Sequence, residues 1–120
     1  VNELPSRPMY GECSWGTYKV IDFSTFTDGN LSLTQLLQLK AGYDISYRVH
    51  QCRDISWTCI DGSGILVLDG QVKNIQRGDV IHIGKGHRYA VKAESNLQIV
   101  EVQTGDQLTD NDVKYLDWHW

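Results

Sequence analysis

The residues with the clearest capacity for chemistry are His50 and Cys52, which lie two positions apart in the stretch SYRVHQCRDISW. Alternate side chains of a β-strand point to the same face, so this spacing predicts that an imidazole and a thiol share one face with Arg48. Such a trio does not make an ordinary apolar core, because buried polar groups need partners. The pattern therefore predicts a strand that either lines a polar cavity or faces water.

A second histidine, His87, follows in the stretch GKGHRYAV, where it is expected to share a face with Tyr89. Two imidazoles and one thiol would supply three ligands to a divalent metal such as zinc and leave a fourth position for water or substrate. Short motifs of this kind also occur on solvated strand faces that hold no metal. The sequence therefore predicts His50, Cys52 and His87 as the ligands if a metal is bound, and leaves the alternative of no metal open.

The bulk composition predicts one globular domain. The chain has 120 residues, of which 41% are hydrophobic and 22% charged, and this length is sufficient for a real core. The net charge of −4 argues against a nucleic-acid surface. No apolar run approaches the ~20 residues of a membrane-spanning helix. Three cysteines are an odd count, which fits a reducing compartment, so we expect a cytoplasmic protein.

Short apolar runs separated by Gly, Asp and Asn predict the elements that position these residues. This pattern is typical of an all-β sandwich or barrel, with strands expected at 18–23, 31–39, 45–49, 57–60, 65–68, 80–83, 89–91 and 97–102. Asp69-Gly70, between ILVL and QVKNI, is a strong signal for a two-residue hairpin. The ending TDNDVKYLDWHW is expected to form one helical turn capped by Thr109. We expect residues 1–14 to form an N-terminal arm and residues 15–120 a single domain.

Four stretches of the chain follow, in the same order, the pattern of one known family. WGTYKVID is similar to an opening W-G-S-Y stretch, and LKAGYDISYRVHQCRDISWTCIDGSG follows a longer pattern built around H-x-H. IHIGKGHR is similar to I-P-x-G-x-x-H-R, and IVEVQTGDQLTDNDVKYLD follows the family's ending. From Trp15 to Asp117 the chain thus resembles the cupin domain of type II mannose-6-phosphate isomerases, which usually follows a mannose-1-phosphate guanylyltransferase. The resemblance implies a single-domain cupin, a jelly-roll β-barrel, and by family habit a homodimer.

The chain departs from this pattern at the family's metal site. The resemblance implies a metal held by both histidines of H-x-H, the Glu that follows, and the later His. Carried over by position, these ligands survive at His50 and His87, whereas Cys52 replaces the second His and Ile55 replaces the Glu. A thiolate still binds a soft ion such as zinc, but isoleucine cannot bind a metal. Arg48, where the family has Gln, adds a positive charge to the same face.

The resemblance also implies a sugar phosphate as the ligand and the isomerisation of mannose 6-phosphate as the reaction. Such a reaction needs a base and a group that stabilises the developing oxyanion. If the chain is an enzyme, we expect the catalytic groups among His50, His87 and Glu101. Guanidinium groups bind phosphate and carboxylate well, and aromatic side chains line sugar sites, so the expected ligand-binding residues are Arg48, Arg53, Trp57, Arg88 and Tyr89.

Three functions are open at this point, besides a different cupin reaction such as an epimerase or dioxygenase step, of which a dioxygenase would need a fuller set of His and carboxylate ligands. The first is a free-standing cupin that binds a small sugar phosphate in its barrel, with isomerase activity undecided. The second is an active mannose-6-phosphate isomerase whose metal site is rebuilt on histidine and cysteine. The third is a non-catalytic sensor or a partner-binding cupin. In each case we expect a homodimer with no nucleic-acid partner and no membrane partner.

Overall fold

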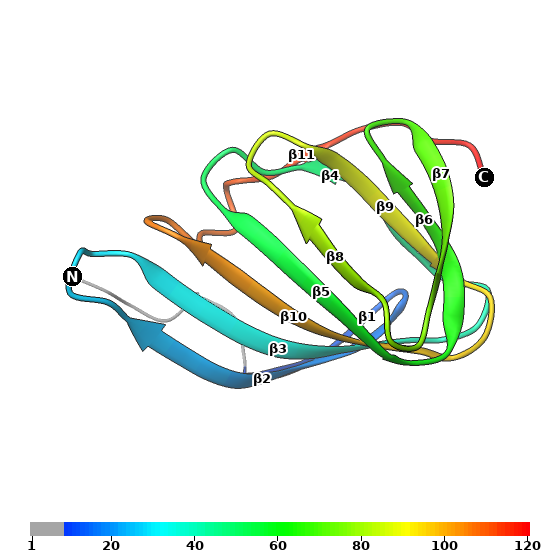
Figure 1. Cartoon of the computed structure of the whole chain (residues 1–120), viewed down its shortest axis with the longest axis horizontal. Helices are drawn as coiled ribbons and strands as arrows, with labels where there is room; N and C mark the ends of the chain where they lie inside the picture. Colours follow the sequence, from blue (N-terminus) through cyan, green and yellow to red (C-terminus); the bar gives the residue numbers. More distant parts are fainter. Residues whose placement is uncertain (1–8) are drawn as a thin grey trace.

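The chain is all-β, with two antiparallel sheets that face each other (Figure 1). A computed structural model describes residues 9–120. The larger sheet has the order β1 (Tyr10–Cys13), β2 (Gly16–Thr25), β3 (Leu31–Leu39), β10 (Leu97–Gly105), β5 (Asp54–Asp61) and β8 (Val80–Ile83). The smaller sheet has the order β11 (Lys114–Tyr115), β4 (Asp44–Val49), β9 (Arg88–Ala93), β6 (Ser63–Leu68) and β7 (Gln71–Gln76). This arrangement confirms the predicted jelly-roll barrel in a single domain.

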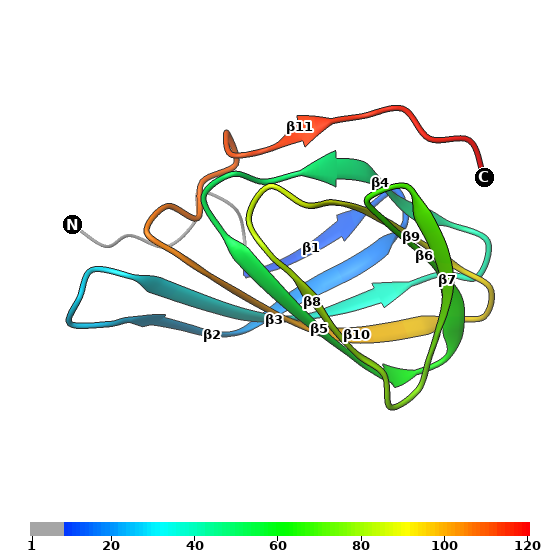
Figure 2. The same ribbon diagram turned by 45° about the horizontal axis from the view of Figure 1, so that its top comes forward.

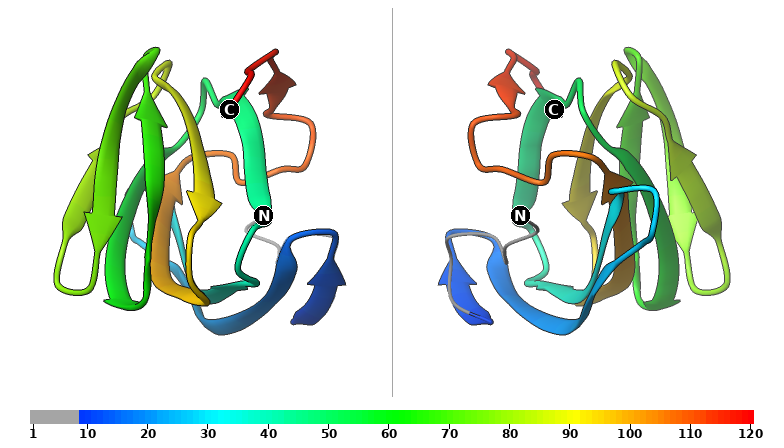
Figure 3. Two further views of the ribbon diagram at one scale, coloured as in Figure 1. Left: turned by 90° about the vertical axis from the view of Figure 1, so that its right-hand side faces the viewer. Right: turned by 90° about the vertical axis from the view of Figure 1, so that its left-hand side faces the viewer.

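The main core lies between the two sheets. Viewed along the longest axis of the molecule, the strands surround a common interior (Figure 3). Side chains from both sheets pack there, among them Trp57 and Ile55 from β5, Leu66 from β6, and Val91 from β9. Their burial follows from the two-residue period of a strand, which sends every second side chain inward.

The segment Leu31–Leu39, which has many helix-forming residues, is strand β3, as its alternation predicts. Every second side chain is buried, and the inward row consists of leucines with Gln35 at its centre. A buried glutamine in an otherwise apolar row needs hydrogen-bond partners. It therefore marks the place on this strand where the interior becomes polar.

The predicted hairpin at Asp69-Gly70 is confirmed. Leu68 pairs with Gln71, so that the loop between β6 and β7 has two residues. Both loop residues have positive φ, 50° at Asp69 and 80° at Gly70, as a type I′ turn requires.

The two ends of the described chain differ from the expectations. Residues 10–13, which we expected in an irregular arm, form strand β1 and pair with β2; the rest of that arm at 1–8 lies outside the described residues. The expected helical turn near the C-terminus is wrong. A turn at residues 110–111 leads instead into β11, whose Tyr115 pairs with Arg48 of β4. Within the described part of the chain, no helix is long and apolar enough to cross a membrane.

The residues after β10 leave the larger sheet and cross to the smaller one (Figure 2). We call residues 106–116 the C-terminal crossover. Helix formation there competes with tertiary contacts, because the Asp112 carboxylate accepts hydrogen bonds from the backbone N–H groups of Gln51 and Cys52. These contacts tie the crossover to the end of β4 and explain why it is extended.

Candidate functional site

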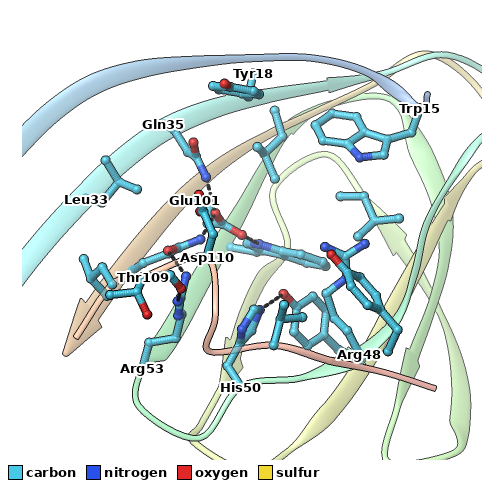
Figure 4. A pocket seen from close by; sticks show the side chains of 18 residues that line it. Trp15, Tyr18, Leu33, Gln35, Arg48, His50, Arg53, Glu101, Thr109 and Asp110 are labelled. Atoms are coloured by element: carbon cyan, nitrogen blue, oxygen red, sulfur yellow. Dashed lines mark hydrogen bonds between the residues drawn. The ribbon is translucent and has the colours of Figure 1, made fainter. Parts of the chain in front are cut away.

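A cavity of about 230 Å³ opens between the sheets, beneath the C-terminal crossover (Figure 4). Its walls come from β2, β3, β4, β5, β9 and β10 and from the crossover. Several aromatic side chains line it, namely Trp15, Tyr18, Trp57, Tyr89 and Tyr115. Polar and charged side chains alternate with these aromatic groups, and a cavity that combines aromatic surfaces with oriented polar groups is suited to a small polar molecule.

A β-bulge in β4 turns Arg48 toward this cavity. Between the pairs Ile45–Val91 and Arg48–Tyr89, strand β4 has one residue more than β9. The extra residue reverses the alternation of side chains along the strand. As a result Ile45 and Arg48 both line the cavity, whereas Tyr47 packs on the other face of the smaller sheet against Trp118.

Glu101 forms the polar floor of the cavity and is only 3% exposed. In the sheet register it lies between Gln35 of β3 and Trp57 of β5. Gln35 Nε2 and Gln103 Nε2 each donate to Glu101 Oε1 at 2.6 Å, and Trp57 Nε1 donates to Oε2 at 2.7 Å. These three donors satisfy the buried carboxylate and hold it in one orientation at the floor of the cavity.

His50 follows β4 directly, and both nitrogens of its ring are engaged. Nδ1 contacts the carbonyl oxygen of Asp112. Because a carbonyl only accepts, Nδ1 carries the proton, and Nε2 of the neutral ring accepts from the Tyr89 hydroxyl at 2.8 Å. Burial lowers the pKa of His50; the hydrogen bond to Asp112 opposes this shift, and the Arg53 charge adds to it. The imidazole is therefore held in the neutral form.

Arg53 connects the floor of the cavity to the crossover. Its Nη1 donates to Gln103 Oε1 at 2.9 Å, its Nε donates to Asp112 Oδ2 at 3.2 Å, and its Nη2 donates to the Thr109 carbonyl. Burial acts to raise the pKa of the Asp112 carboxyl, but the N–H groups of Gln51 and Cys52 and the Arg53 charge outweigh it and hold that pKa below its usual value. Arg53 is thus a structural clamp with an ionised partner.

Arg48 has a different set of contacts. Its Nε donates to the Ser46 carbonyl at 2.9 Å and its Nη2 to the Ser46 hydroxyl at 3.0 Å. The guanidinium lies 5.1 Å from the ring centre of Tyr115, which is a cation–π distance. Within residues 9–120, no carboxylate forms an ion pair with Arg48.

The predicted convergence of His50, Cys52 and His87 is wrong. His87 lies outside the cavity with its side chain 56% exposed, and its Nδ1 contacts Asp69 Oδ2 at 2.6 Å. Cys52 lies in the loop after β4 and does not line the cavity either. His87 precedes β9 rather than belonging to it, so the strand alternation that turns Tyr89 inward does not extend to it.

The described residues do not fit a divalent metal at this site. Both nitrogens of His50 already have partners, and Ile55 is 1% exposed in the apolar core. In the part of the chain that the structure describes, no three His, Cys, Asp or Glu side chains are grouped to hold a metal ion. Zinc is bound by imidazole, thiolate and carboxylate groups that converge on one point, and the described residues of this cavity do not provide such a set.

The other predicted site residues divide into two groups. Arg48, His50, Arg53, Trp57, Tyr89 and Glu101 line one cavity. Arg88 does not: it is 52% exposed at the surface beside Asp69. The backbone N–H of Arg88 and then His87 lower the pKa of Asp69, so this loop is a surface cluster separate from the cavity.

The sequence reasoning missed Gln35, Gln103 and Asp112. The sequence pattern could have placed Gln103 in the cavity, because it is two residues from Glu101 on the same strand and must share its face. Gln35 had a weaker signal, as the polar residue in an alternating apolar row. Asp112 had none, since its partners are 59 to 61 residues away in the sequence.

Together, the two-sheet barrel and the polar cavity between its sheets place this protein in the class of cupins. Solved structures support the fold. A Klebsiella pneumoniae protein with a double-stranded β-helix domain is 18% identical, with a TM-score of 0.69 over 93% of this chain and 90% of its own. The cupin domain of Schizosaccharomyces pombe Cnp3 is 11% identical, with a TM-score of 0.62 over 74% of this chain and 65% of its own.

The family described as Mannose-6-phosphate isomerase C-terminal matches residues 8–118, and the chain belongs to that family. A mannose-1-phosphate guanylyltransferase of Sinorhizobium fredii is 27% identical over 101 residues, which are 82% of this chain and 19% of that protein. The chain therefore spans about one fifth of the length of this relative.

Proposed function

We propose that this cupin binds a small sugar-phosphate-type ligand in the cavity between its sheets. The observation that carries the proposal is the floor built on Glu101, whose carboxylate is fixed by Gln35, Gln103 and Trp57 and lines a cavity with aromatic walls. A fixed acceptor beneath aromatic surfaces suits a ring with several hydroxyl groups. Membership of the family and the guanylyltransferase relative support a sugar phosphate.

The proposal is for binding rather than for isomerisation. The alternative of an isomerase with a rebuilt His50, Cys52 and His87 metal site is not favoured, because these residues do not converge. The alternative of a sensor or partner-binding cupin is compatible with ligand binding without turnover. The homodimer, the cytoplasmic location and the absence of other partners stay predictions.

Thermal unfolding and calorimetry with mannose 6-phosphate and fructose 6-phosphate test the proposal. A ligand that binds only the folded state stabilises it by ~2.7 kcal/mol at 100 times its Kd, so we expect a rise of several degrees in Tm. The same rise is expected in EDTA, because the site is built without metal ligands. No rise in Tm and no binding heat at millimolar concentrations of either sugar phosphate would refute the proposal.

A blocking variant shows whether the ligand binds in this cavity. Thr109 is exposed and lines the cavity from the crossover, so Thr109→Trp should fill the opening and abolish the ligand-induced rise in Tm. Asp106→Trp is the matched control, since Asp106 is exposed on the same segment but does not line the cavity. Conversion of mannose 6-phosphate to fructose 6-phosphate is assayed in parallel, and turnover would favour the isomerase alternative.

A further inference from the structure

We propose that Arg48 is the anion-binding residue of this cavity, and that it makes the protein selective for hexoses with a phosphate ester or a carboxylate at one end. The inference rests on the proposed function and deepens it by naming the residue that recognises the anion. The resemblance drawn from the sequence puts Gln at this position in the family, so an anion contact made by this residue would belong to this chain.

The other candidate cations are unsuited to this role. Arg53 also lines the cavity, but each of its three guanidinium nitrogens has an acceptor, one of them the ionised Asp112. An anion that approached Arg53 would meet a charge that is already paired. Arg88 is at the surface beside Asp69 and does not line the cavity.

Arg48 has both a spare donor and an uncompensated charge. Nε and Nη2 are tethered to Ser46, which leaves Nη1 with no hydrogen-bond partner among the described residues. The cation–π contact with Tyr115 holds the plane of the guanidinium. A fixed guanidinium that faces a cavity binds phosphate or carboxylate with little further loss of side-chain freedom.

The charge distribution also sets the direction in which the ligand lies. Glu101 is buried on the floor, whereas Arg48 is half-buried and contacts the exposed Tyr115. Tyr89 lies between them, because it pairs with Arg48 in the register of β4 and β9 and its ring lies 5.3 Å from that of Trp57, which donates to Glu101. An anion is repelled by Glu101 on the floor and by Asp110, which lines the cavity from the crossover, and it is attracted by Arg48, so it lies beside Arg48. The neutral hydroxyl groups would then lie against the floor formed by Glu101, which Figure 4 shows beside Gln35.

Calorimetric titration of three ligands into the wild type, Arg48→Gln and Arg48→Lys tests this inference. The ligands are mannose, mannose 6-phosphate and mannuronate, so that the phosphate ester and the carboxylate are compared on the same ring. Arg88→Gln is the control, because it removes an arginine outside the cavity. Each titration is repeated at a higher salt concentration, because salt screens an exposed ion pair.

We expect the wild type to bind at least one of the two anionic sugars about tenfold or more tightly than mannose, a difference typical of one charge-assisted contact. Arg48→Gln should lose that preference and its salt dependence, Arg48→Lys should keep part of it, and Arg88→Gln should keep all of it. If Arg48→Gln still prefers the same anionic sugar as the wild type does, the inference is wrong while the proposed function stands. If the wild type binds none of the three sugars, the proposed function falls and the inference falls with it.

Discussion

Single buried side chains in the cavity are tied to one another in a continuous network. Asp112 binds Arg53, Arg53 binds Gln103, and Gln103 binds Glu101. Trp57 completes the network by donating its indole N–H to Glu101. A buried polar group costs little free energy when it is paired and much more when a partner is removed. We therefore expect that removing one hydrogen-bonding group from this network destabilises the fold by more than the loss of its few atoms would.

Two tryptophans with buried Nε1 atoms, the fully buried Trp57 and the half-buried Trp118, offer a comparison on this point. Trp57 Nε1 donates to Glu101, whereas Trp118 Nε1 is buried with no partner among the described residues. Trp57→Phe and Trp118→Phe remove the same atoms, but only the first leaves a carboxylate short of a donor. We expect Trp57→Phe to lower the free energy of unfolding by ~1–3 kcal/mol more than Trp118→Phe. Urea denaturation measures both values, and equal losses would contradict the prediction.

The neutral state of His50 predicts a pH dependence of stability. Its folded-state pKa lies below the ordinary 6.5, chiefly because of burial. The unfolded chain thus takes up a proton at a higher pH than the folded chain does. As the pH falls through 6.5 toward the folded pKa, the free energy of unfolding should decrease, by at most about 1.4 kcal/mol per pH unit.

His50→Gln provides the comparison, because glutamine cannot titrate. We expect the wild type to lose more stability than His50→Gln when the pH is lowered from about 7.5 to about 5. Asp112 and Asp69 have lowered pKa values and titrate below this pH range, so they do not contribute to the difference in stability loss between the two proteins. If the free energy of unfolding falls by the same amount in both proteins across this pH range, the pKa of His50 is not lowered in the folded state.

At the scale of the strands, a β-bulge and tight turns determine which side chains point inward and how neighbouring strands pair. The bulge in β4 turns Arg48 inward. The Asp69-Gly70 turn fixes the register of β6 and β7, while Gly62 sits in the tight connection between β5 and β6. Gly62 has a φ of 85°, and a Cβ there would lie 2.0 Å from the carbonyl oxygen of Asn96. At this position a side chain is excluded by both backbone conformation and space.

Gly62→Ala and Gly70→Ala separate the cost of the left-handed backbone conformation from the cost of a steric clash. Gly70 has a φ of 80°, but a Cβ added there would meet nothing within 4 Å. Gly70→Ala should therefore cost only the left-handed conformation, ~1–2 kcal/mol. Gly62→Ala should cost that amount plus the displacement of Asn96, a total above ~3 kcal/mol. Thermal unfolding of both variants measures the difference. Similar Tm values would show that the backbone near Asn96 shifts at little cost to make room for the added Cβ.

For the whole molecule, the C-terminal crossover joins the two sheets and closes the cavity. It starts from β10 in the larger sheet and ends as β11 on the smaller one. Asp112 holds its middle, through Arg53 and the backbone N–H groups of Gln51 and Cys52. The cavity thus depends on contacts between segments that are about sixty residues apart.

Asp112→Ala tests how strongly the crossover is fixed. The substitution leaves Arg53 buried without its carboxylate, so we expect a loss of ~3 kcal/mol in the free energy of unfolding. Asp106→Ala, at an exposed position on the same segment, should change stability by less than ~0.5 kcal/mol. A loss at Asp112 no larger than at Asp106 would mean that the crossover is held by other contacts.

The sequence by itself was sufficient to predict most of the strands, the hairpin at Asp69-Gly70 and the family. Residues 31–39 and 80–83 form β3 and β8 with the bounds that their apolar runs predict, and the Asp69-Gly70 turn forms between β6 and β7. These features depend on local chemistry, namely alternation and turn preference, which a sequence displays directly. The strands β1 and β11 were missed because each exists only through pairing with another strand.

Only the tertiary structure decided which polar side chains meet. A bulge reversed the alternation along β4, His87 fell outside the strand that turns Tyr89 inward, and the ring of His50 found partners in Tyr89 and Asp112. The physical reason is that one extra residue in a strand reverses the alternation beyond it, and that the alternation does not hold past the end of a strand. Such events depend on how distant strands pair, and no local pattern records them.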